Sequence, residues 1–330
     1  MQNTSVSCHN QQPAPASTPF CALVGPTASG KSDLALSLAE TAGAEILSVD
    51  AMQVYQHLDV GTAKPTPEER QRVKHYGLDL VSVQEQYNAT RFAEYAEPIL
   101  SQAIRQNTPL ILCGGTGLYF RALLEGFFQV PDPDPELREQ LKKRAQSEGA
   151  SKLVQELREK DPETAARIHP HDTKRVLRAL EIIAQTGSSV TDLRSRQTKK
   201  PWIGQTVFIG LMRDRKDLNE RIIRRTHWMY QNGLIEETRY LLDMGCTSEH
   251  TAFQALGYKE CELYLKREWS LEESRAQTIM NTQRYAKRQL TWFRRQFPTQ
   301  WVFVENFTFS HETLRKCLQI WQVNANNKAG

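Results

Sequence analysis

The chain has 330 residues, of which 39% are hydrophobic and 24% are charged, and its formal net charge is +4. This composition is typical of a globular protein of about two domains and excludes a disordered or fibrous chain. No apolar run approaches the ~20 residues that a membrane-spanning helix needs. The first residues also lack the basic and apolar regions of a signal peptide. We therefore expect neither a membrane protein nor a secreted one.

Short apolar runs alternate with helical patterns in the first part of the chain. The predicted strands cover residues 20–24, 45–49, 78–83, 109–113 and 205–212. A helix is predicted over residues 32–42 and ends at Gly43. Strands that alternate with helices indicate an α/β fold, in which helices cover both faces of a parallel sheet.

The first predicted strand leads into Gly25-Pro26-Thr27-Ala28-Ser29-Gly30-Lys31-Ser32. This segment matches the P-loop pattern G-x-x-x-x-G-K-[ST], in which glycines let backbone N–H groups curl around a phosphate. The helix N-terminus adds positive charge, Lys31 neutralises phosphate oxygens, and Ser32 is placed to hold Mg²⁺. The sequence therefore predicts a P-loop NTPase-like fold with a di- or triphosphate ligand.

Two other strand ends carry candidate functional residues. Asp50 follows the second strand, where the carboxyl ends of parallel strands face the ligand crevice, and it acts either as a base or as a helix cap. The fourth strand runs into Gly114-Gly115-Thr116-Gly117, which predicts either an anion-binding nest or a tight turn. No carboxylate follows that strand, although P-loop NTPases usually place a Mg²⁺-binding Asp there.

The segment between the fourth and fifth strands reads only as helices. It is too long for a crossover connection, so we predict an all-helical insertion domain. The predicted domains are a disordered tail at 1–19, a catalytic core at 20–123 and 200–310, the insertion at 124–199 and a C-terminal tail at 311–330. Within the core, Ser270 and Glu273 predict a capping box at the start of a long helix, and residues 301–304 predict a last strand.

The cysteines and the charges indicate where the protein works and on what. The six cysteines are scattered without a C-x-x-C pair, which argues against a zinc site or a disulfide framework and predicts a reducing, cytoplasmic location. Basic residues concentrate in residues 174–200 and 274–304, and the second of these segments contains no acidic residue. This excess favours a polyanionic partner, although solvated helix faces explain it equally well.

Several longer segments follow one another between residues 20 and 300. They are GPTASGKS (25–32), SVDAMQVY (48–55), GTAKP (61–65), GGTGLYFRAL (114–123), AARIHPHDTKRVLRALE (165–181), FQALGYKE (253–260) and QRYAKRQLTWFR (283–294). Together they resemble the bacterial tRNA dimethylallyltransferase family. The resemblance implies transfer of a dimethylallyl group from dimethylallyl diphosphate to N6 of adenosine 37 of tRNA, 3′ of the anticodon, with release of pyrophosphate. It also implies Mg²⁺ as cofactor and the tRNA anticodon stem-loop as partner, and we expect a monomer.

The resemblance and the chemistry together assign site residues. The expected catalytic residues are Asp50 as general base, Lys31 and Thr116. The expected diphosphate-binding residues are Gly25, Pro26, Thr27, Ala28, Ser29, Gly30, Lys31 and Ser32, to which the charge of the leaving pyrophosphate adds Arg121 and Arg221. The expected tRNA-binding residues are Asp50, Ala51, Met52, Gln53, Thr116, Arg138, Lys174, Arg175, Val176, Leu177 and Arg178. Ser32 is the expected metal ligand.

Other functions remain open on the sequence alone. They are a small-molecule kinase that uses ATP, a non-catalytic RNA-binding regulator, and an adenylate isopentenyltransferase that acts on free nucleotides. The basic second half of the chain disfavours the first and third, and the regulator leaves Asp50 without a role. Trp292 and Phe293 either stack RNA bases or pack in the core, which their helical spacing favours. His169 and His171 lack a third metal ligand, and residues 254–259 line the crevice or form a turn.

Overall fold

The computed structural model describes residues 20–127, 130–132, 134–196, 201–247, 250–305 and 309–326, so the tail expected at 1–19 lies outside it. The chain divides into two compact units. The P-loop unit contains the described residues up to Leu124 and from Pro201 onward, and the insertion unit contains Glu125–Lys200.

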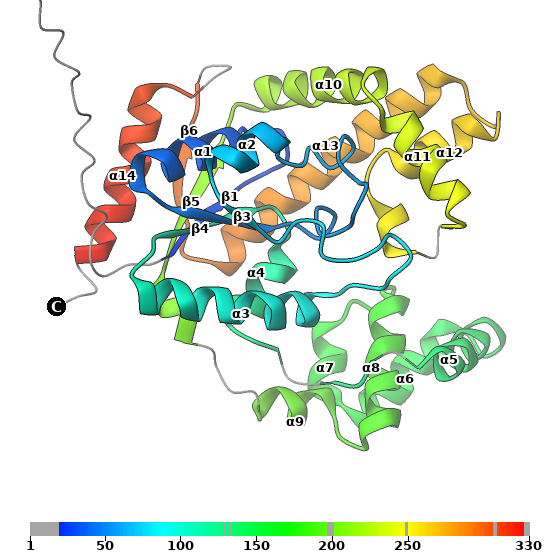
Figure 1. Cartoon of the computed structure of the whole chain (residues 1–330). Coiled ribbons are helices and arrows are strands. Elements are labelled where there is room, and N and C mark those ends of the chain that lie inside the picture. The colour runs from blue at the N-terminus through cyan, green and yellow to red at the C-terminus, as the bar shows by residue number, and fades with distance from the viewer. Residues whose placement is uncertain are drawn as a thin grey trace, which may run out of the picture. The chain divides into compact units, whose positions relative to one another are not determined.

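A parallel sheet forms the centre of the P-loop unit (Figure 1). Its strands are β1 (Phe20–Val24), β2 (Glu45–Val49), β3 (His75–Tyr76), β4 (Leu110–Gly114), β5 (Thr206–Met212) and β6 (Gln300–Phe303), in the order β3-β2-β4-β1-β5-β6. The predicted α/β fold is confirmed. Because β4 lies between β1 and β2, the loops that follow these three strands meet at one edge of the sheet.

Two predictions about the core need correction. The third strand is β3 and not residues 78–83, within which Val81 makes an isolated bridge to Tyr55. The backbone turns there because Asp79 has a φ of 55°, and its carboxylate accepts a hydrogen bond from Lys64 at 2.7 Å. The segment expected only as a C-terminal tail contains a helix, α14 (His311–Asn326).

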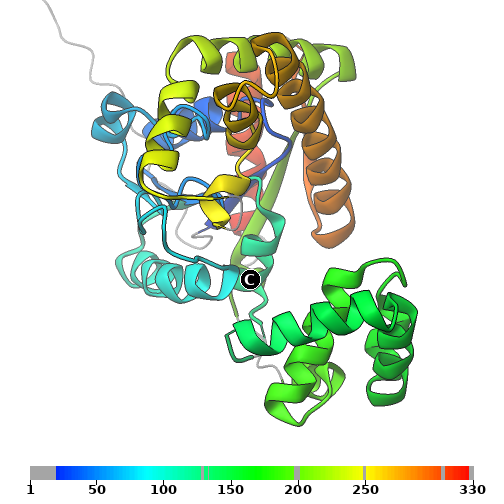
Figure 2. The same cartoon turned by 90° about the vertical axis from the view of Figure 1, so that its right-hand side faces the viewer.

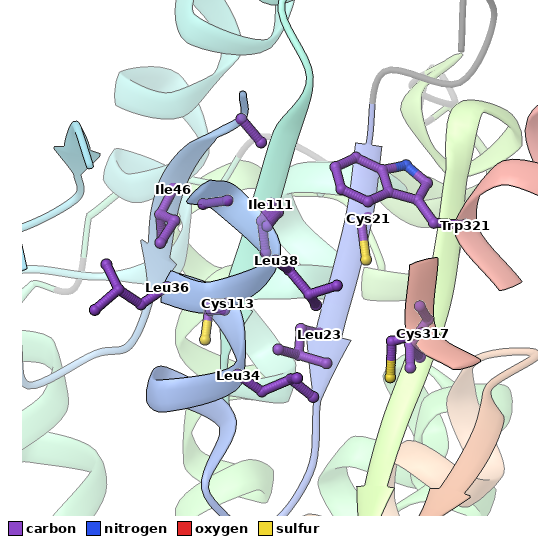
Figure 3. Packing of buried hydrophobic residues seen from close by; sticks show 14 of the residues in the cluster. Cys21, Leu23, Leu34, Leu36, Leu38, Ile46, Ile111, Cys113, Cys317 and Trp321 are labelled. Carbon is purple, nitrogen blue, oxygen red and sulfur yellow. The ribbon is translucent and has the colours of Figure 1, made fainter. Parts of the chain in front are cut away.

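One face of the sheet packs against α1 (Lys31–Ala42) and α14. Alternate residues of each strand point to this face, as the two-residue period of a strand requires. The buried cluster, seen from close by in Figure 3, includes Cys21, Leu23, Leu34, Leu38, Ile111, Cys317 and Trp321. The helix near the end of the chain therefore completes the core around the first strand.

The opposite face packs against α4 (Gly117–Leu124) and α13 (Leu271–Gln296), with α3 (Ala89–Gln106) beside α4. The ring of Phe120 lies 6.4 Å from that of Phe208 and 5.6 Å from that of Phe293. Phe293 is fully buried and Trp292 lies edge-on to it at 5.0 Å, so the structure supports core packing for both. The predicted capping box at the start of α13 is confirmed.

The other helices of the P-loop unit are α2 (Pro67–Arg72), α10 (Arg215–Gln231), α11 (Leu234–Asp243) and α12 (Tyr258–Leu265), with 3₁₀ turns at Pro201–Gln205 and Thr251–Gln254. The insertion unit contains α5 (Pro135–Ser147), α6 (Ala150–Lys160), α7 (Pro162–Arg167), α8 (Thr173–Thr186) and α9 (Val190–Ser195). These five helices gather around their own apolar core, as Figure 2 shows in green. Across the described ranges, no helix combines the length and apolarity needed to cross a membrane.

Candidate active site

The P-loop joins β1 to α1 with a backbone that only certain residues tolerate. Gly25 has a φ of 148° and Gly30 a φ of 92°, both outside the range that most side chains adopt. A Cβ atom on Gly25 would also lie 2.8 Å from the carbonyl oxygen of Leu211 in β5. The glycines of the motif are thus required both by conformation and by close packing.

Two arginines of the segment around α10 hold the outer side of the P-loop. Arg213 Nε donates to the carbonyl of Ser29 at 2.8 Å, and Arg221 Nε donates to that of Ala28 at 2.7 Å. Arg213 is buried and pairs with Asp217 at 2.8 Å. Arg221 therefore lies at the phosphate loop, as predicted, and Arg213 is a second such arginine that the sequence reasoning missed.

Lys31 lies in the cavity at the start of α1. Its Nζ donates to the carbonyl of Pro26 at 2.8 Å. Burial lowers the pKa of Lys31 to about 8, with a smaller effect in the same direction from Arg225, whereas Asp50 acts to raise it. An anionic ligand at this position would restore the charge of the ammonium group, because it supplies the missing counter-charge.

The glycines after β4 serve close packing rather than an anion-binding nest. Among the residues with positive φ, none belongs to the segment Gly114–Gly117. Cβ atoms on Gly114, Gly115 and Gly117 would instead lie within 2.3 Å of Val49, Gln289 and Trp292 respectively. The nest alternative is therefore not supported, and the segment works as a tight junction between β2, β4 and α13.

Asp50 and Thr116 are brought together at this junction. The hydroxyl of Thr116 accepts a hydrogen bond from the backbone N–H of Ala51 at 3.0 Å. Oδ1 of Asp50 accepts from the N–H of Met52 at 2.9 Å, whereas Oδ2 has no hydrogen-bond partner among the described residues. Asp50 therefore closes a local turn with one oxygen and keeps the other for a ligand.

Gln53 has a more structural position than predicted. Its side chain is buried, and Oε1 accepts from the hydroxyl of Ser48 at 2.7 Å. Its Nε2 donates to the carbonyls of Thr62 and Ala63, both at 3.2 Å. The amide is thus already engaged at both ends, and it fixes the segment 59–64 against the end of β2.

A second buried glutamine, which the sequence reasoning missed as a site residue, joins two loops of the site. Oε1 of Gln289 on α13 accepts from the N–H of Thr27 at 2.7 Å, and Nε2 donates to the carbonyl of Gly115 at 2.9 Å. The side chain is only 6% exposed. Gln289 therefore fixes the phosphate loop relative to the loop that carries Thr116. The acid-free run of α13 hinted at this helix, but the choice of residue depends on its orientation.

Two more residues near Asp50 were also missed. Arg225 of α10 lies in the same cavity, and burial lowers the pKa of its guanidinium while the charge of Asp50 opposes that shift. Tyr285 of α13 lines the cavity as well, and burial followed by the charge of Asp50 raises its pKa to about 12. A buried cation, a phenol and a carboxylate in one cavity provide charge neutralisation, a hydrogen-bond donor and a base.

The loop 59–64 forms another wall of the cavity and is held by a carboxylate. Glu237 of α11 accepts from the N–H groups of Asp59, Val60 and Gly61 at 2.9, 2.6 and 3.0 Å. It also accepts from the hydroxyl of Tyr258 at 2.7 Å. Lys64 closes the loop from within through Asp59 at 2.6 Å.

The cavity has a volume of about 1300 Å³, more than the ~300–1,000 Å³ typical of a small-molecule site. It is lined by most of the predicted residues of the P-loop unit, namely Thr27, Ala28, Gly30, Lys31, Ser32, Asp50, Ala51, Met52, Gln53, Thr116 and Arg221. Residues 254–256 also line it, which favours the crevice alternative for that segment.

Arg121 needs correction as a diphosphate ligand. It is exposed on α4 and does not line the cavity. Neighbouring Phe120 and Leu124 on the same helix are fully buried, so the helical turn directs Arg121 away from the core.

The tRNA-binding residues predicted in the insertion unit divide into exposed and engaged ones. Lys174 and Arg175 are exposed at the start of α8. Arg138 and Arg178 pair with the buried carboxylate of Glu181 at 3.2 and 3.0 Å. Val176 is buried in the core of the unit, so it needs correction as a tRNA contact. Leu177 packs partly against the same core.

His169 and His171 lie with ring centroids 5.3 Å apart in the insertion unit. The described residues contain no cluster of three or more His, Cys, Asp or Glu side chains that could hold a metal ion. These histidines are therefore loop residues in the structure.

Comparison with known proteins identifies relatives of this chain. The family model described as IPP transferase matches residues 53–296. The chain is 40% identical over 293 residues to the tRNA dimethylallyltransferase of Halothermothrix orenii, covering 88% of this chain and 89% of the relative. It is 43% identical over 273 residues to tRNA dimethylallyltransferase 2 of Syntrophus aciditrophicus, covering 82% and 87%.

Solved structures are similar as well. The tRNA isopentenylpyrophosphate transferase of Bacillus halodurans matches with a TM-score of 0.69 at 35% identity, over 94% of this chain and 98% of the other. A eukaryotic dimethylallyltransferase, described as acting on tRNA, matches with a TM-score of 0.73 at 26% identity, over 95% and 78%.

Proposed function

We propose, because this chain belongs to the tRNA dimethylallyltransferase (IPP transferase) family, that it transfers the dimethylallyl group of dimethylallyl diphosphate to N6 of adenosine 37 in tRNA. The observation that carries the proposal is one cavity lined by the P-loop, by Asp50 and by a set of arginines. Its volume has room for a prenyl diphosphate together with a nucleobase. Since tRNA is the acceptor, we place the enzyme in the cytoplasm.

The reaction couples one bond formed to one bond broken. The N6 amine of adenosine attacks C1 of the dimethylallyl group while the bond from C1 to the diphosphate oxygen breaks, and pyrophosphate leaves with the electron pair. The amine is a poor nucleophile because its lone pair is delocalised into the ring, so a base must accept its proton. Oδ2 of Asp50 is the proposed acceptor, and Thr116 positions Asp50 through the N–H of Ala51.

The developing negative charge of pyrophosphate is met by fixed cations. Lys31, Arg221 and Arg225 line the cavity beside the P-loop. Groups that are already oriented stabilise such charge without reorganisation during the reaction. Because Arg225 is desolvated, its interaction with a phosphate is stronger than that of an arginine in water.

The residues present also fit the Mg²⁺ that the family implies. Ser32 lines the cavity, and its hydroxyl has no hydrogen-bond partner in the part of the chain that the structure describes. Mg²⁺ typically binds one or two protein groups and takes its remaining oxygens from phosphates and water. Ser32 would hold the ion together with the diphosphate, where the ion neutralises charge on the leaving group.

The function is tested by supplying the purified protein with Mg²⁺, dimethylallyl diphosphate and unmodified tRNA. Nucleoside analysis of the tRNA should show N6-isopentenyladenosine at position 37. Parallel reactions with AMP as acceptor, and with ATP labelled at its γ-phosphate, separate the two enzyme alternatives. Prenylation of AMP but not of tRNA would favour the nucleotide enzyme, and γ-phosphate transfer without prenylation would favour a kinase.

A further inference from the structure

An exposed tryptophan lies at the wall of the active-site cavity. Trp228 of α10 is 52% exposed, yet it lines the same cavity as Lys31 and Asp50. Tryptophan is usually well buried, because its ring carries a large apolar area. In the described structure this ring makes no aromatic or cation–π contact. An uncovered ring at a substrate cavity indicates that a ligand covers it.

The ring is surrounded by positive charge. Arg221, Arg224 and Arg225 lie seven, four and three residues before Trp228, so they share one side of α10 with it. All three line the cavity, and so does Arg288 of α13. Trp228 is therefore an apolar surface within a cluster of cations, and its ligand must offer both a flat apolar group and negative charge.

We propose that Trp228 is a stacking platform for an unpaired base of the tRNA anticodon loop that neighbours the target adenosine. The proposal rests on the proposed function, because it assumes an RNA acceptor in this cavity. Single-stranded loops are recognised by stacking their splayed bases on aromatic side chains while basic residues hold the phosphates. A nucleotide supplies the base for Trp228 and the phosphate for Arg224 and Arg288.

The prenyl donor does not match this surface equally well. Its diphosphate belongs at the P-loop, which Arg213 and Arg221 hold from the outer side. Its dimethylallyl group is short and carries no charge of its own. The donor therefore leaves Arg224 and Arg288 without an anion, whereas a loop nucleotide engages the ring and the arginines together.

The test measures how Trp228 variants bind an anticodon stem-loop RNA. Trp228→Ala should weaken binding about 10-fold, and Trp228→Phe should retain most of the affinity, since stacking needs an aromatic face. The slope of log K against log salt should stay unchanged in both variants, because the ring carries no charge. Phe303→Ala is the matched control, because Phe303 is 47% exposed on β6 but does not line the cavity.

The stacked nucleotide can be located by replacing the loop bases one at a time with abasic sites. One abasic position should weaken binding to the wild type but have no further effect on Trp228→Ala. Unchanged RNA affinity of Trp228→Ala would overturn the proposal. So would a raised KM for dimethylallyl diphosphate with unchanged RNA affinity, which would assign the ring to the donor. If the wild type itself fails to bind or prenylate the RNA, the proposed function fails instead.

Discussion

Asp50 differs from the other carboxylates of the cavity in having one oxygen bound locally and one without a partner. Asp50→Asn keeps the acceptor for the N–H of Met52 but removes the base. We expect the single-turnover rate to fall by ~10²–10⁴ while the affinity for tRNA stays close to that of the wild type. Asp59→Asn is the control, because Asp59 also lines the cavity but pairs with Lys64. A loss of tRNA affinity with an unchanged rate would make Asp50 a recognition residue.

Lys31 makes the use of the donor depend on pH. Its pKa of about 8 means that the ammonium group is charged below that pH and neutral above it. The positive form binds the anionic donor, so the KM for dimethylallyl diphosphate should rise as the pH increases from about 7 to 9.5. In Lys31→Arg the rise should disappear, since guanidinium stays charged throughout this range. A flat KM in the wild type would contradict the role of Lys31.

At the scale of elements, α13 connects the two loops that hold donor and base. Gln289→Leu removes both hydrogen bonds of that connection, to Thr27 and to Gly115. We expect the KM for the donor to rise and the free energy of unfolding to fall by about 1–3 kcal/mol, because two buried backbone groups lose their partner. Gln277→Leu on the same helix is the control, because Gln277 bonds only Asn281. Equal behaviour of the two variants in donor KM would exclude the positioning role.

The loop 59–61 depends in the same way on α11. Glu237→Ala leaves three N–H groups and the hydroxyl of Tyr258 without their acceptor. The expected loss is about 1–3 kcal/mol of unfolding free energy, measured by denaturant titration. The neighbouring Glu236→Ala provides the comparison, because Glu236 is exposed one position away on α11. Similar stability of both variants would show that water replaces Glu237.

At the scale of the whole molecule, basic residues of the insertion unit are expected to contribute to tRNA binding. Lys174 and Arg175 are exposed, so replacing both with Ala should reduce the salt dependence of tRNA binding by about 1 in slope. Arg138→Ala should mainly destabilise the unit, because Glu181 loses one of its two partners. An unaltered slope in the double variant would place the RNA contacts elsewhere.

Much of this architecture is predictable from the sequence, for reasons that particular residues show. The P-loop, the strand at 20–24 and the capped start of α13 are local patterns, so their chemistry can be read directly. Arg121 and Val176 were assigned by proximity in sequence to matched motifs, but the side that a helix turns outward decides whether a residue reaches a site. Gln289, Arg225 and Glu237 act across more than 150 residues of sequence, and no local pattern marks such contacts.

The position of α14 constrains the order of events during synthesis. β1 is the first strand to leave the ribosome, but one of its faces is covered by Cys317 and Trp321, which emerge last. The nascent P-loop unit must therefore wait with part of its sheet uncovered, whereas the insertion unit, whose apolar core lies within residues 125–200, already has all its packing partners. A protein of this topology exposes its phosphate-binding strand longest at the moment when chaperones meet it.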